Sequence, residues 1–374
     1  MKIPRINIDK IRKTKNVDYT FVAVVLILLA YGLIMVFSAS SASAHYRMND
    51  TFYFIKRQAL WAFLGLGGMA FFSSVPYKFY YKHATKILAV AIVLLVAVLT
   101  PLGVEVNGAQ RWLGFGPFTF QPSEFAKFAL IIFLSKSLAD NSDIMKSSWG
   151  GFALYMAIIA VVAGLVIIEP HMSGAVLIAG VGVILLFVAG AKWSHLSVVA
   201  VVGVIGMFIL AIIAPYRLER LTSFIDPFAD ASDTGFQVVQ SFYAIGSGGF
   251  FGLGLGQSRQ KFLYLPEPQN DFIFSIICEE LGFFGALLVI VLFTVLIWKG
   301  VRIALRAPDA FSSLLVSGII AILGLQAILN IAVVTGSMPN TGVPLPFFSY
   351  GGTSLFIILC SMGIVLNVTR HIKK

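Results

Sequence analysis

One carboxylate stands at the border between polar and apolar sequence. Asp271 follows a stretch of 55 residues rich in polar, aromatic and glycine residues, and the next residues, Phe272 to Ile277, are apolar. An ionisable side chain at the edge of a bilayer-length apolar run is costly and usually functional. Asp271 is therefore a candidate general base, and its structural alternative is the N-cap of the helix that follows.

Other acids lie inside apolar runs, where charge is rare. Glu124 and Lys127 are three residues apart and can meet on one helix, either as an ion pair that locks packing or as part of a site. Glu279 and Glu280 lie on the same expected helix as the segment after Asp271. The favoured explanation for them is hydrogen bonding between helices near a break at Gly282.

A glycine-rich run, 246–256, is followed by the polar sequence Gln-Ser-Arg-Gln-Lys over 257–261. It is either an interfacial loop whose phenylalanines contact headgroups, or a backbone anion nest beside Arg259 and Lys261. Arg111 could add a third contact to a phosphate. Together with a carboxylate, these groups suit an amphiphile that bears phosphate, such as a lipid-linked sugar.

The composition shows which elements must hold these groups. The chain has 374 residues, of which 58% are hydrophobic and 12% charged, whereas soluble domains carry about 25% charged residues. The sequence predicts an all-α integral membrane protein with ten transmembrane helices, since about 20 apolar residues cross a bilayer. The runs lie near 18–40, 58–75, 84–102, 121–137, 151–168, 173–190, 195–214, 272–298, 311–335 and 353–369.

Lysine and arginine set the expected orientation. Eighteen of the 27 basic residues fall in the two tails and the even-numbered connections, and eight fall on the opposite side. The positive-inside rule then puts both termini in the cytoplasm. The tail 1–17 is cytoplasmic, and the large loop 215–270, between helices 7 and 8, is extracytoplasmic. The net charge of +10 is thus a topology signal and does not indicate nucleic-acid binding.

Further polar segments are expected as loops on the outer side at 103–120, 169–172 and 336–352. Cys278 and Cys360 fall in apolar runs and are expected to pack as small residues, with no disulfide or metal-thiolate site. No Gly-x-x-x-x-Gly-Lys-Ser/Thr sequence occurs, which disfavours work driven by ATP. The site is therefore expected at the outer membrane surface.

Several motifs, in order along nearly the whole chain, resemble the shape, elongation, division and sporulation family of peptidoglycan glycosyltransferases, which includes RodA, FtsW and SpoVE. The wording of the loop motifs is more similar to the division and sporulation branch. The matching segments are Asn107–Trp112, Gln121–Lys127, Gly235–Ser241, Gly254–Lys261, Tyr264–Glu267, Asp271–Phe274, Glu279–Gly282 and Pro344–Gly352.

The resemblance implies a single polytopic domain over 1–374 in the bacterial cytoplasmic membrane. It implies a polymerase of lipid II, which joins disaccharide-pentapeptide units and releases undecaprenyl diphosphate, with a class B penicillin-binding protein transpeptidase as partner. Asp271 falls on the proposed catalytic aspartate. The substrate-binding candidates are Arg111, Glu124, Lys127, Gln257, Ser258, Arg259, Lys261, Glu279 and Ser349.

One turn departs from the family pattern. Many members carry an aspartate in a Gln-Pro-Asp-Leu-Gly turn after the fifth helix, and here that turn begins Glu169-Pro170-His171. If the aspartate takes part in the reaction, either Glu169 or His171 must replace it. A mechanism with two aspartates is therefore doubtful for this chain.

The chemistry needs only one essential carboxylate, because a diphosphate is already a good leaving group. Asp271 would deprotonate the acceptor hydroxyl, which attacks the anomeric carbon with inversion. The candidates to neutralise the diphosphate are Lys127, Arg111, Arg259 and Lys261. Whether a divalent cation such as Mg²⁺ also takes part is left open by the sequence. A lipid II flippase and a scaffold without activity are the rival functions.

Overall fold

The computed structural model describes residues 17–106, 108–115, 118–141, 149–213, 223–230, 235–262 and 264–372. The predicted tail 1–17, apart from Val17, and the basic residues Arg217 and Arg220 lie outside these ranges. The described helices are α1 (Tyr19–Met48), α2 (Tyr53–Ser74), α3 (Tyr77–Val98), α4 (Pro122–Asp140), α6 (Trp149–Ile168), α7 (Met172–Val188), α8 (Trp193–Ile213), α10 (Phe236–Gly248), α11 (Ile273–Leu305), α12 (Ala310–Val334) and α13 (Gly352–Thr369).

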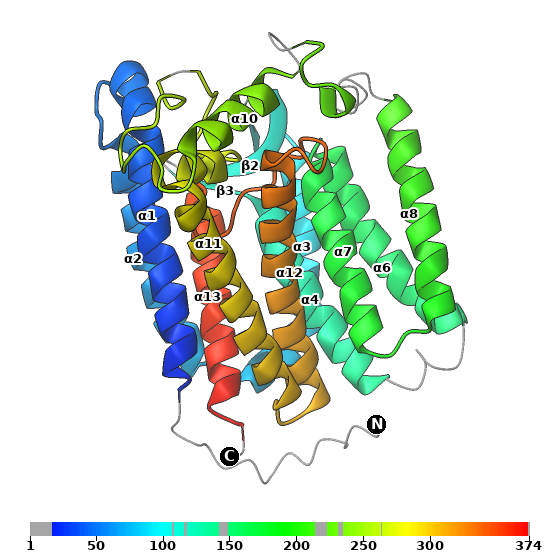
Figure 1. Ribbon diagram of the computed structural model, residues 1–374. Helices are drawn as coiled ribbons and strands as arrows, with labels where there is room; N and C mark the ends of the chain where they lie inside the picture. Colours follow the sequence, from blue (N-terminus) through cyan, green and yellow to red (C-terminus); the bar gives the residue numbers. More distant parts are fainter. Residues whose placement is uncertain are drawn as a thin grey trace.

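Each of the ten predicted apolar runs coincides with one of these helices, and α10 is the additional, shorter helix. Six of the helices, α1, α3, α6, α11, α12 and α13, are long and apolar enough to cross a membrane. The chain is therefore a multi-pass membrane protein. The helices form a bundle, with α10 and the longer loops gathered at one end, which we call the site end (Figure 1).

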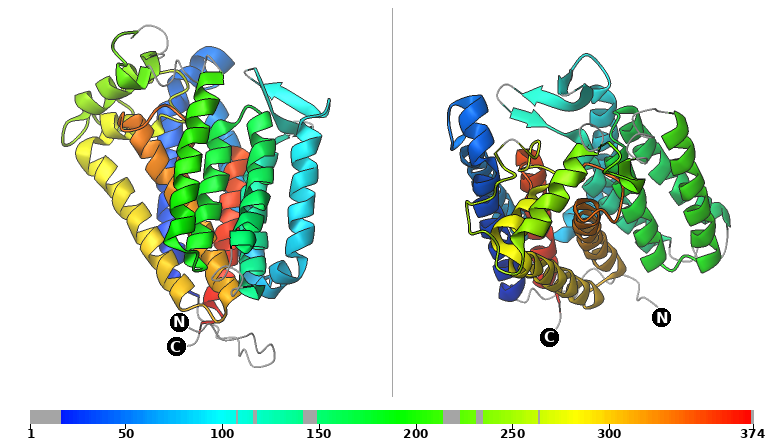
Figure 2. Two further views of the ribbon diagram at one scale, coloured as in Figure 1. Left: turned by 90° about the vertical axis from the view of Figure 1, so that its right-hand side faces the viewer. Right: turned by 45° about the horizontal axis from the view of Figure 1, so that its top comes forward.

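The segment 103–120, expected to be an irregular loop, forms a three-stranded antiparallel sheet at the site end (Figure 2). Its strands are β1 (Gly103–Val106), β2 (Ala109–Phe115) and β3 (Phe118–Phe120). The register shifts between Val104 and Glu105, as a β-bulge does. Leu113 of β2 is buried and holds the sheet on the bundle. This is a tertiary effect, which the short, glycine-rich sequence did not indicate.

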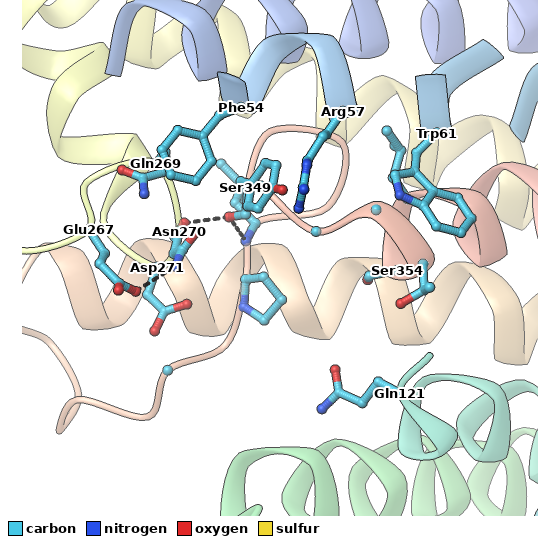
Figure 3. A pocket seen from close by; sticks show the side chains of 18 of the residues that line it. Phe54, Arg57, Trp61, Gln121, Glu267, Gln269, Asn270, Asp271, Ser349 and Ser354 are labelled. Carbon is cyan, nitrogen blue, oxygen red and sulfur yellow. Dashed lines mark hydrogen bonds between the residues drawn. The ribbon is translucent and has the colours of Figure 1, made fainter. Parts of the chain in front are cut away.

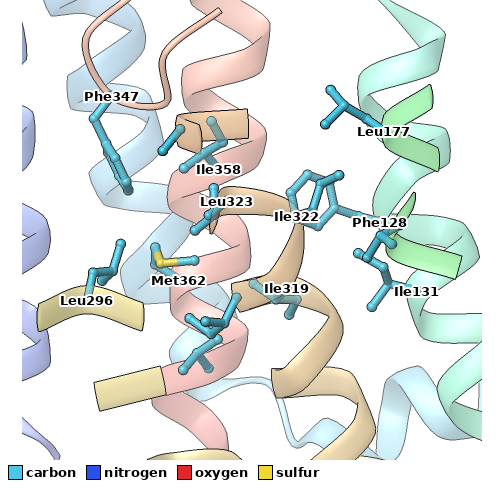
Figure 4. Close-up of a cluster of buried hydrophobic side chains, with 14 of the residues drawn as sticks. Phe128, Ile131, Leu177, Leu296, Ile319, Ile322, Leu323, Phe347, Ile358 and Met362 are labelled. Atoms are coloured by element: carbon cyan, nitrogen blue, oxygen red, sulfur yellow. The ribbon is translucent and has the colours of Figure 1, made fainter. Parts of the chain in front are cut away.

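The bundle centre contains buried apolar side chains from α4, α7, α11, α12 and α13 (Figure 4). In α12 and α13, 67% and 72% of the most apolar stretch is buried, which makes these two helices central. Helix α8 lies at the side (Figure 1), and among its described side chains only His195 is buried. The two cysteines are buried and unpaired by disulfides, as predicted.

Glycines bring α2 and α13 into close contact. A Cβ added at Gly363 of α13 would overlap the backbone of Met69, and one at Gly65 of α2 would overlap Leu359. Small residues allow helices in membranes to approach in this way. Gly67 is two residues from both Gly65 and Met69, on the opposite face of α2, and faces open space.

This difference gives a stability test. Gly363→Ala forces the two backbones apart and should lower the free energy of unfolding by about 1–3 kcal/mol, the usual cost of overpacking. Gly67→Ala should be neutral or stabilising, because alanine favours a helix over glycine. Equal thermal midpoints for the two variants in detergent would contradict the packing argument.

Candidate functional site

A cavity of about 1000 Å³ opens at the site end of the bundle. Its walls come from α1, α2, β2, the start of α4, and the segments 261–271 and 342–355. Figure 3 shows Arg57 and Trp61 of α2 on one side, Asp271 and Glu267 on another, and Gln121 opposite. The volume is at the upper end of the range for small-molecule sites, about 300–1000 Å³.

Asp271 lines this cavity just before α11. The hypothesis that it caps the helix is wrong: the N-cap is Phe272, and no side chain makes a capping hydrogen bond. The Asp271 carboxylate lies against Gly342, where an added Cβ would sit 3.2 Å from Oδ2. Gly342 has φ +67°, a backbone conformation that glycine adopts without strain. The carboxylate therefore faces the cavity beside a bare stretch of backbone.

The backbone around Asp271 is held by buried amides and hydroxyls. Asn330 of α12 donates through Nδ2 to the carbonyls of Asp271, at 2.7 Å, and Val343, at 2.8 Å. Ser349 donates to the Asn270 carbonyl at 2.7 Å and accepts from the Leu345 amide. Ser349 lines the cavity, but these two bonds make its hydroxyl a brace between the two loops that meet at Asp271.

The polar segment before Asp271 is fixed to α11 by two neighbouring carboxylates. Glu279 accepts from the Ser258 hydroxyl and from the Arg259 amide at 2.9 Å. Glu280 accepts from the amides of Gly256 and Ser258 at 3.0 and 3.2 Å. The anion-nest hypothesis is therefore wrong for these amides, because the protein's own carboxylates occupy them. Helix α11 does break where predicted, at Gly282.

Glu280 also carries a buried ion pair. Lys261 Nζ lies 3.0 Å from Glu280 Oε1, and both side chains are almost fully buried. Ser38 of α1 donates to the same carboxylate at 2.6–2.7 Å. The bonds from Ser38 of α1 to Glu280 of α11 confirm the expected helix-to-helix bonding for Glu280. The bonds of both glutamates to the loop 256–261 were not predicted.

The predicted Glu124–Lys127 pair is confirmed. Lys127 Nζ lies 2.7 Å from Glu124 Oε1, and both groups are buried in α4. Ser354 of α13 donates to the second oxygen of Glu124 at 2.9 Å. Glu124 lines the cavity and Lys127 lies behind it, so the lysine acts on the cavity through the carboxylate.

The unusual turn after α6 places its two titratable groups differently. His171 lines the cavity, and its Nδ1 lies 3.2 Å from the Ser123 hydroxyl. Burial and the nearby Arg111 lower the pKa of His171 to about 4, so the imidazole is neutral at pH 7. Glu169 is fully buried, and neither carboxylate oxygen has a hydrogen-bond partner in the described structure. Of the two titratable side chains of this turn, His171 lines the cavity and Glu169 does not.

Arg111 joins the turn to the sheet. Its guanidinium donates to the carbonyls of Glu169 and Pro170, and it lines the cavity from β2. Burial raises the pKa of Glu169 to about 8, and the neighbouring Arg111 opposes that rise only in part. The carboxyl group is therefore protonated at neutral pH.

The structure brings together half of the predicted site residues. Those that line the cavity are Asp271, Arg111, Glu124, Lys261 and Ser349. Those that do not line it are Lys127, Gln257, Ser258, Arg259 and Glu279. The side chains of Gln257 and Arg259 are exposed elsewhere, whereas Ser258 and Glu279 bond to each other.

Two cationic lining residues, Arg47 and Arg57, were not assigned a role from the sequence. Arg57 lies 4.4 Å from the Tyr53 ring centroid, one turn away on α2. Its spacing of four residues from both Tyr53 and Trp61 puts all three on one helical face. The position of a basic residue between two aromatic residues on one helical face was the signal that the sequence offered for Arg57.

In the described parts of the chain, no group of three or more His, Cys, Asp or Glu side chains is placed to hold a metal ion. The described side chains therefore form no three-ligand site for a resident divalent cation.

Comparison with known proteins defines the family. A family model described as a cell cycle protein, FtsW/RodA/SpoVE, matches residues 18–374. The chain is 44% identical over 360 residues to stage V sporulation protein E of Bacillus subtilis (strain 168), covering 96% of this chain and 98% of that protein. The chain belongs to the FtsW/RodA/SpoVE family.

Two further matches agree with this membership. A probable peptidoglycan glycosyltransferase FtsW of Geobacter sp. (strain M18) is 40% identical over 363 residues, covering 97% of this chain and 99% of that protein. A solved structure described as "Structural coordination of polymerization and crosslinking by a peptidoglycan synthase complex" matches with a TM-score of 0.80 and 30% identity, over 95% of this chain and 98% of that one. The FtsW/RodA/SpoVE fold therefore extends over nearly the whole chain.

The buried ion pair of this FtsW/RodA/SpoVE member can be tested by removing one partner. Glu280→Ala leaves Lys261 buried without its counterion and frees two loop amides, so the free energy of unfolding should fall by about 3–5 kcal/mol. Lys56→Ala, which breaks an exposed pair with Asp50, should change it little. Unfolding titrations in mixed detergent measure the free energy of unfolding of both variants. Similar losses in the two variants would contradict the argument that burial makes the Glu280 pair important.

Glu169 gives a test by pH. The folded state keeps the Glu169 proton up to about pH 8, whereas the unfolded state releases it near 4.5. Stability from this group is therefore full below pH 4.5 and is lost as the pH rises towards 8. Glu169→Gln should raise the thermal midpoint at pH 9 relative to the wild type and flatten the change between pH 6 and 9. Glu105→Gln, at an exposed position of β1, is the control and should leave that change intact.

Proposed function

We propose that the cavity is where this chain, a peptidoglycan glycosyltransferase, joins lipid II units into glycan strands with release of undecaprenyl diphosphate. The observation that carries the proposal is Asp271 in the wall of a 1000 Å³ cavity that also holds several cationic side chains. Relatives that match over nearly their whole length are named peptidoglycan glycosyltransferase FtsW and stage V sporulation protein E. Division or sporulation is the process that these names support.

Asp271 acts as the general base. It takes the proton of the acceptor hydroxyl, whose oxygen attacks the anomeric carbon of the donor from the face opposite the diphosphate. The electron pair of the broken bond leaves on the diphosphate, so no acid needs to protonate the leaving group. Arg111 and Arg57 line the same cavity and balance that charge, while Lys127 and Lys261 are already paired with glutamates.

Other candidates from the sequence take positioning roles in this proposal. Glu279 and Ser258 hold the segment that leads to Asp271, and Ser349 braces it from the other side. Gln257 and Arg259, being exposed on the same segment, are available to contact headgroups or substrate from outside the cavity. A divalent cation such as Mg²⁺ would arrive with the substrate diphosphate, since the described residues supply no group of three ligating side chains for it.

We further propose ten transmembrane helices, with both termini in the cytoplasm and the site end, including 215–270, outside the cytoplasmic membrane. The distribution of lysine and arginine supports this orientation. A class B penicillin-binding protein transpeptidase is the proposed partner, because a matching solved structure is described as a peptidoglycan synthase complex that coordinates polymerisation and crosslinking.

The rival function is transport of lipid II across the membrane. Against it, the polar lining and the long loops gather at the site end of the bundle, as a surface enzyme requires (Figure 1). Purified protein and lipid II in detergent separate the two functions, since a detergent solution has no second compartment. Glycan strands formed there require a polymerase.

The catalytic assignment predicts a specific loss. Asp271→Asn removes the base while keeping the shape of the side chain, so strand synthesis should fall by at least about 100-fold, the lower bound for general base catalysis. Asp226→Asn, at an exposed aspartate of the same polar segment, should retain activity. Gel analysis of strands from lipid II, with thermal midpoints as a folding check, measures both variants. Full synthesis by a folded Asp271→Asn protein would remove Asp271 from the mechanism.

A further inference from the structure

Asp271 lies in a wall shared by two hollows. Beside the large cavity is a second one of about 320 Å³. Arg47, Glu267, Asn270 and Asp271 line both, whereas Gln237 of α10 lines only the second. A single carboxylate can therefore be approached from two directions.

Glycosyl transfer with inversion needs this arrangement. The acceptor oxygen and the leaving diphosphate must lie on opposite sides of the anomeric carbon, and the base must touch the acceptor hydroxyl. Two substrates that enter from the same side would compete for one position. Two hollows that meet at the base allow both to be bound at once.

Charge separates the hollows. The second has one cationic residue, Arg47, against the carboxylates of Glu267 and Asp271. The large cavity shares these three groups and adds Arg57 and Arg111. Its other charged lining residues, Glu124 and Lys261, are paired with Lys127 and Glu280. The two additional arginines attract a diphosphate, which therefore belongs in the large cavity.

Size and lining agree with this division. At about 320 Å³ the second hollow is at the lower bound for small-molecule sites, about 300 Å³, which suits a single sugar unit. The large cavity also presents the apolar Trp61, Leu355 and Ile358, which suit a lipid chain. An uncharged sugar can bond to the carboxamides of the second hollow without charge neutralisation.

The Gln237 side chain is positioned to form hydrogen bonds with an uncharged sugar. Its Oε1 accepts from Asn340 Nδ2 at 3.0 Å, which holds the carboxamide in place. In the described structure no hydrogen bond engages its Nε2, so the amide donors remain for a sugar hydroxyl or an N-acetyl carbonyl. Gln237 belongs to Gly235–Ser241, one of the segments that carry the family resemblance.

We propose that the second hollow is the acceptor-sugar subsite, with Gln237 as its recognition residue, and that the large cavity takes the lipid-diphosphate donor. The inference rests on the proposed glycosyltransferase function. The acceptor O–H bond breaks with its proton going to Asp271, the bond from that oxygen to the donor anomeric carbon forms, and the bond from that carbon to the diphosphate oxygen breaks.

The test measures the two ligands separately on the full-length protein in detergent. Undecaprenyl diphosphate is added first to fill the large cavity, and binding of a fluorescent, lipid-free disaccharide-pentapeptide is then measured. Gln237→Trp, which fills the second hollow, should weaken saccharide binding at least about tenfold, or 1.4 kcal/mol, and leave undecaprenyl diphosphate binding within about twofold. Arg57→Gln should weaken undecaprenyl diphosphate binding at least about tenfold and leave saccharide binding within about twofold.

Matched variants keep the test sharp if the bulky side chain disturbs folding. Gln237→Ala removes the carboxamide without adding bulk and should also weaken saccharide binding. Asn340→Ala removes the Gln237 bond and the acceptor of the Gly342 amide, but leaves the Gln237 side chain, so it should weaken saccharide binding less than Gln237→Ala. Tyr243→Phe, at an exposed position of α10, should change neither ligand.

Equal weakening of both ligands by a folded Gln237 variant would overturn the proposal, as would unchanged saccharide binding. So would a wild-type protein that polymerises lipid II yet does not bind the saccharide while undecaprenyl diphosphate is present. A wild-type protein that forms no strands from lipid II counts against the glycosyltransferase function itself, which the binding arms do not measure.

Discussion

A buried carboxylate must be surrounded by donors, and this rule shapes the site end of the molecule. Glu279 and Glu280 lie inside the bundle, where a charge without partners costs several kcal/mol. The donors come from the loop 256–261 and from Ser38 of α1. The loop is thus drawn down onto α11, and the next residues of the chain start from a fixed position.

The same docking explains the break in α11. The amides of Leu253 and Gly254 donate to the carbonyls of Glu279 and Glu280, at 2.9 Å each. A Cβ at Gly252 would overlap the Glu280 backbone, so the loop can approach only through glycine. Gly282, with φ +64°, redirects the helix at that point, and the amide of Phe283 then bonds to the loop carbonyl of Gly249. The glycines serve close packing of backbone on backbone.

With one side fixed by α11, Asp271 is fixed on the other by α12 and α2. Asn330 clips the Asp271 carbonyl to the loop carbonyl of Val343. Gln58 of α2 bonds to the Ser349 carbonyl and the Gly351 amide, and so carries the brace on to a third helix. A general base must stay within hydrogen-bond reach of its proton. Rigid helices thus deliver one carboxylate to a cavity edge through buried amides.

Much of this could be predicted from the sequence because long apolar runs have one solution in a membrane. All ten runs became helices, the Glu124–Lys127 pair formed, and Asp271 reached a cavity. The contacts that could not be predicted join residues far apart in the sequence. Carboxylate partners of the glycine-rich loop lie about twenty residues further along the chain, and no local pattern links Gln58 or Asn330 to loops far away in the sequence. The 103–120 sheet depends on packing against the bundle, which short strands do not reveal.

In the proposed mechanism, burial decides which cations can meet the leaving diphosphate. From the sequence alone, lysines and arginines were equal candidates for this role. In the structure Lys127 and Lys261 form ion pairs with buried glutamates, and moving either lysine would leave a buried charge unpaired. Arg57 is exposed at the cavity wall and stacks on Tyr53, an orientation that keeps the guanidinium plane presented. Guanidinium matches phosphate oxygens two at a time and keeps its charge at any working pH. Burial therefore separates these cations: Lys127 and Lys261 neutralise buried glutamates, whereas the proposed mechanism assigns the diphosphate to Arg57 and Arg111.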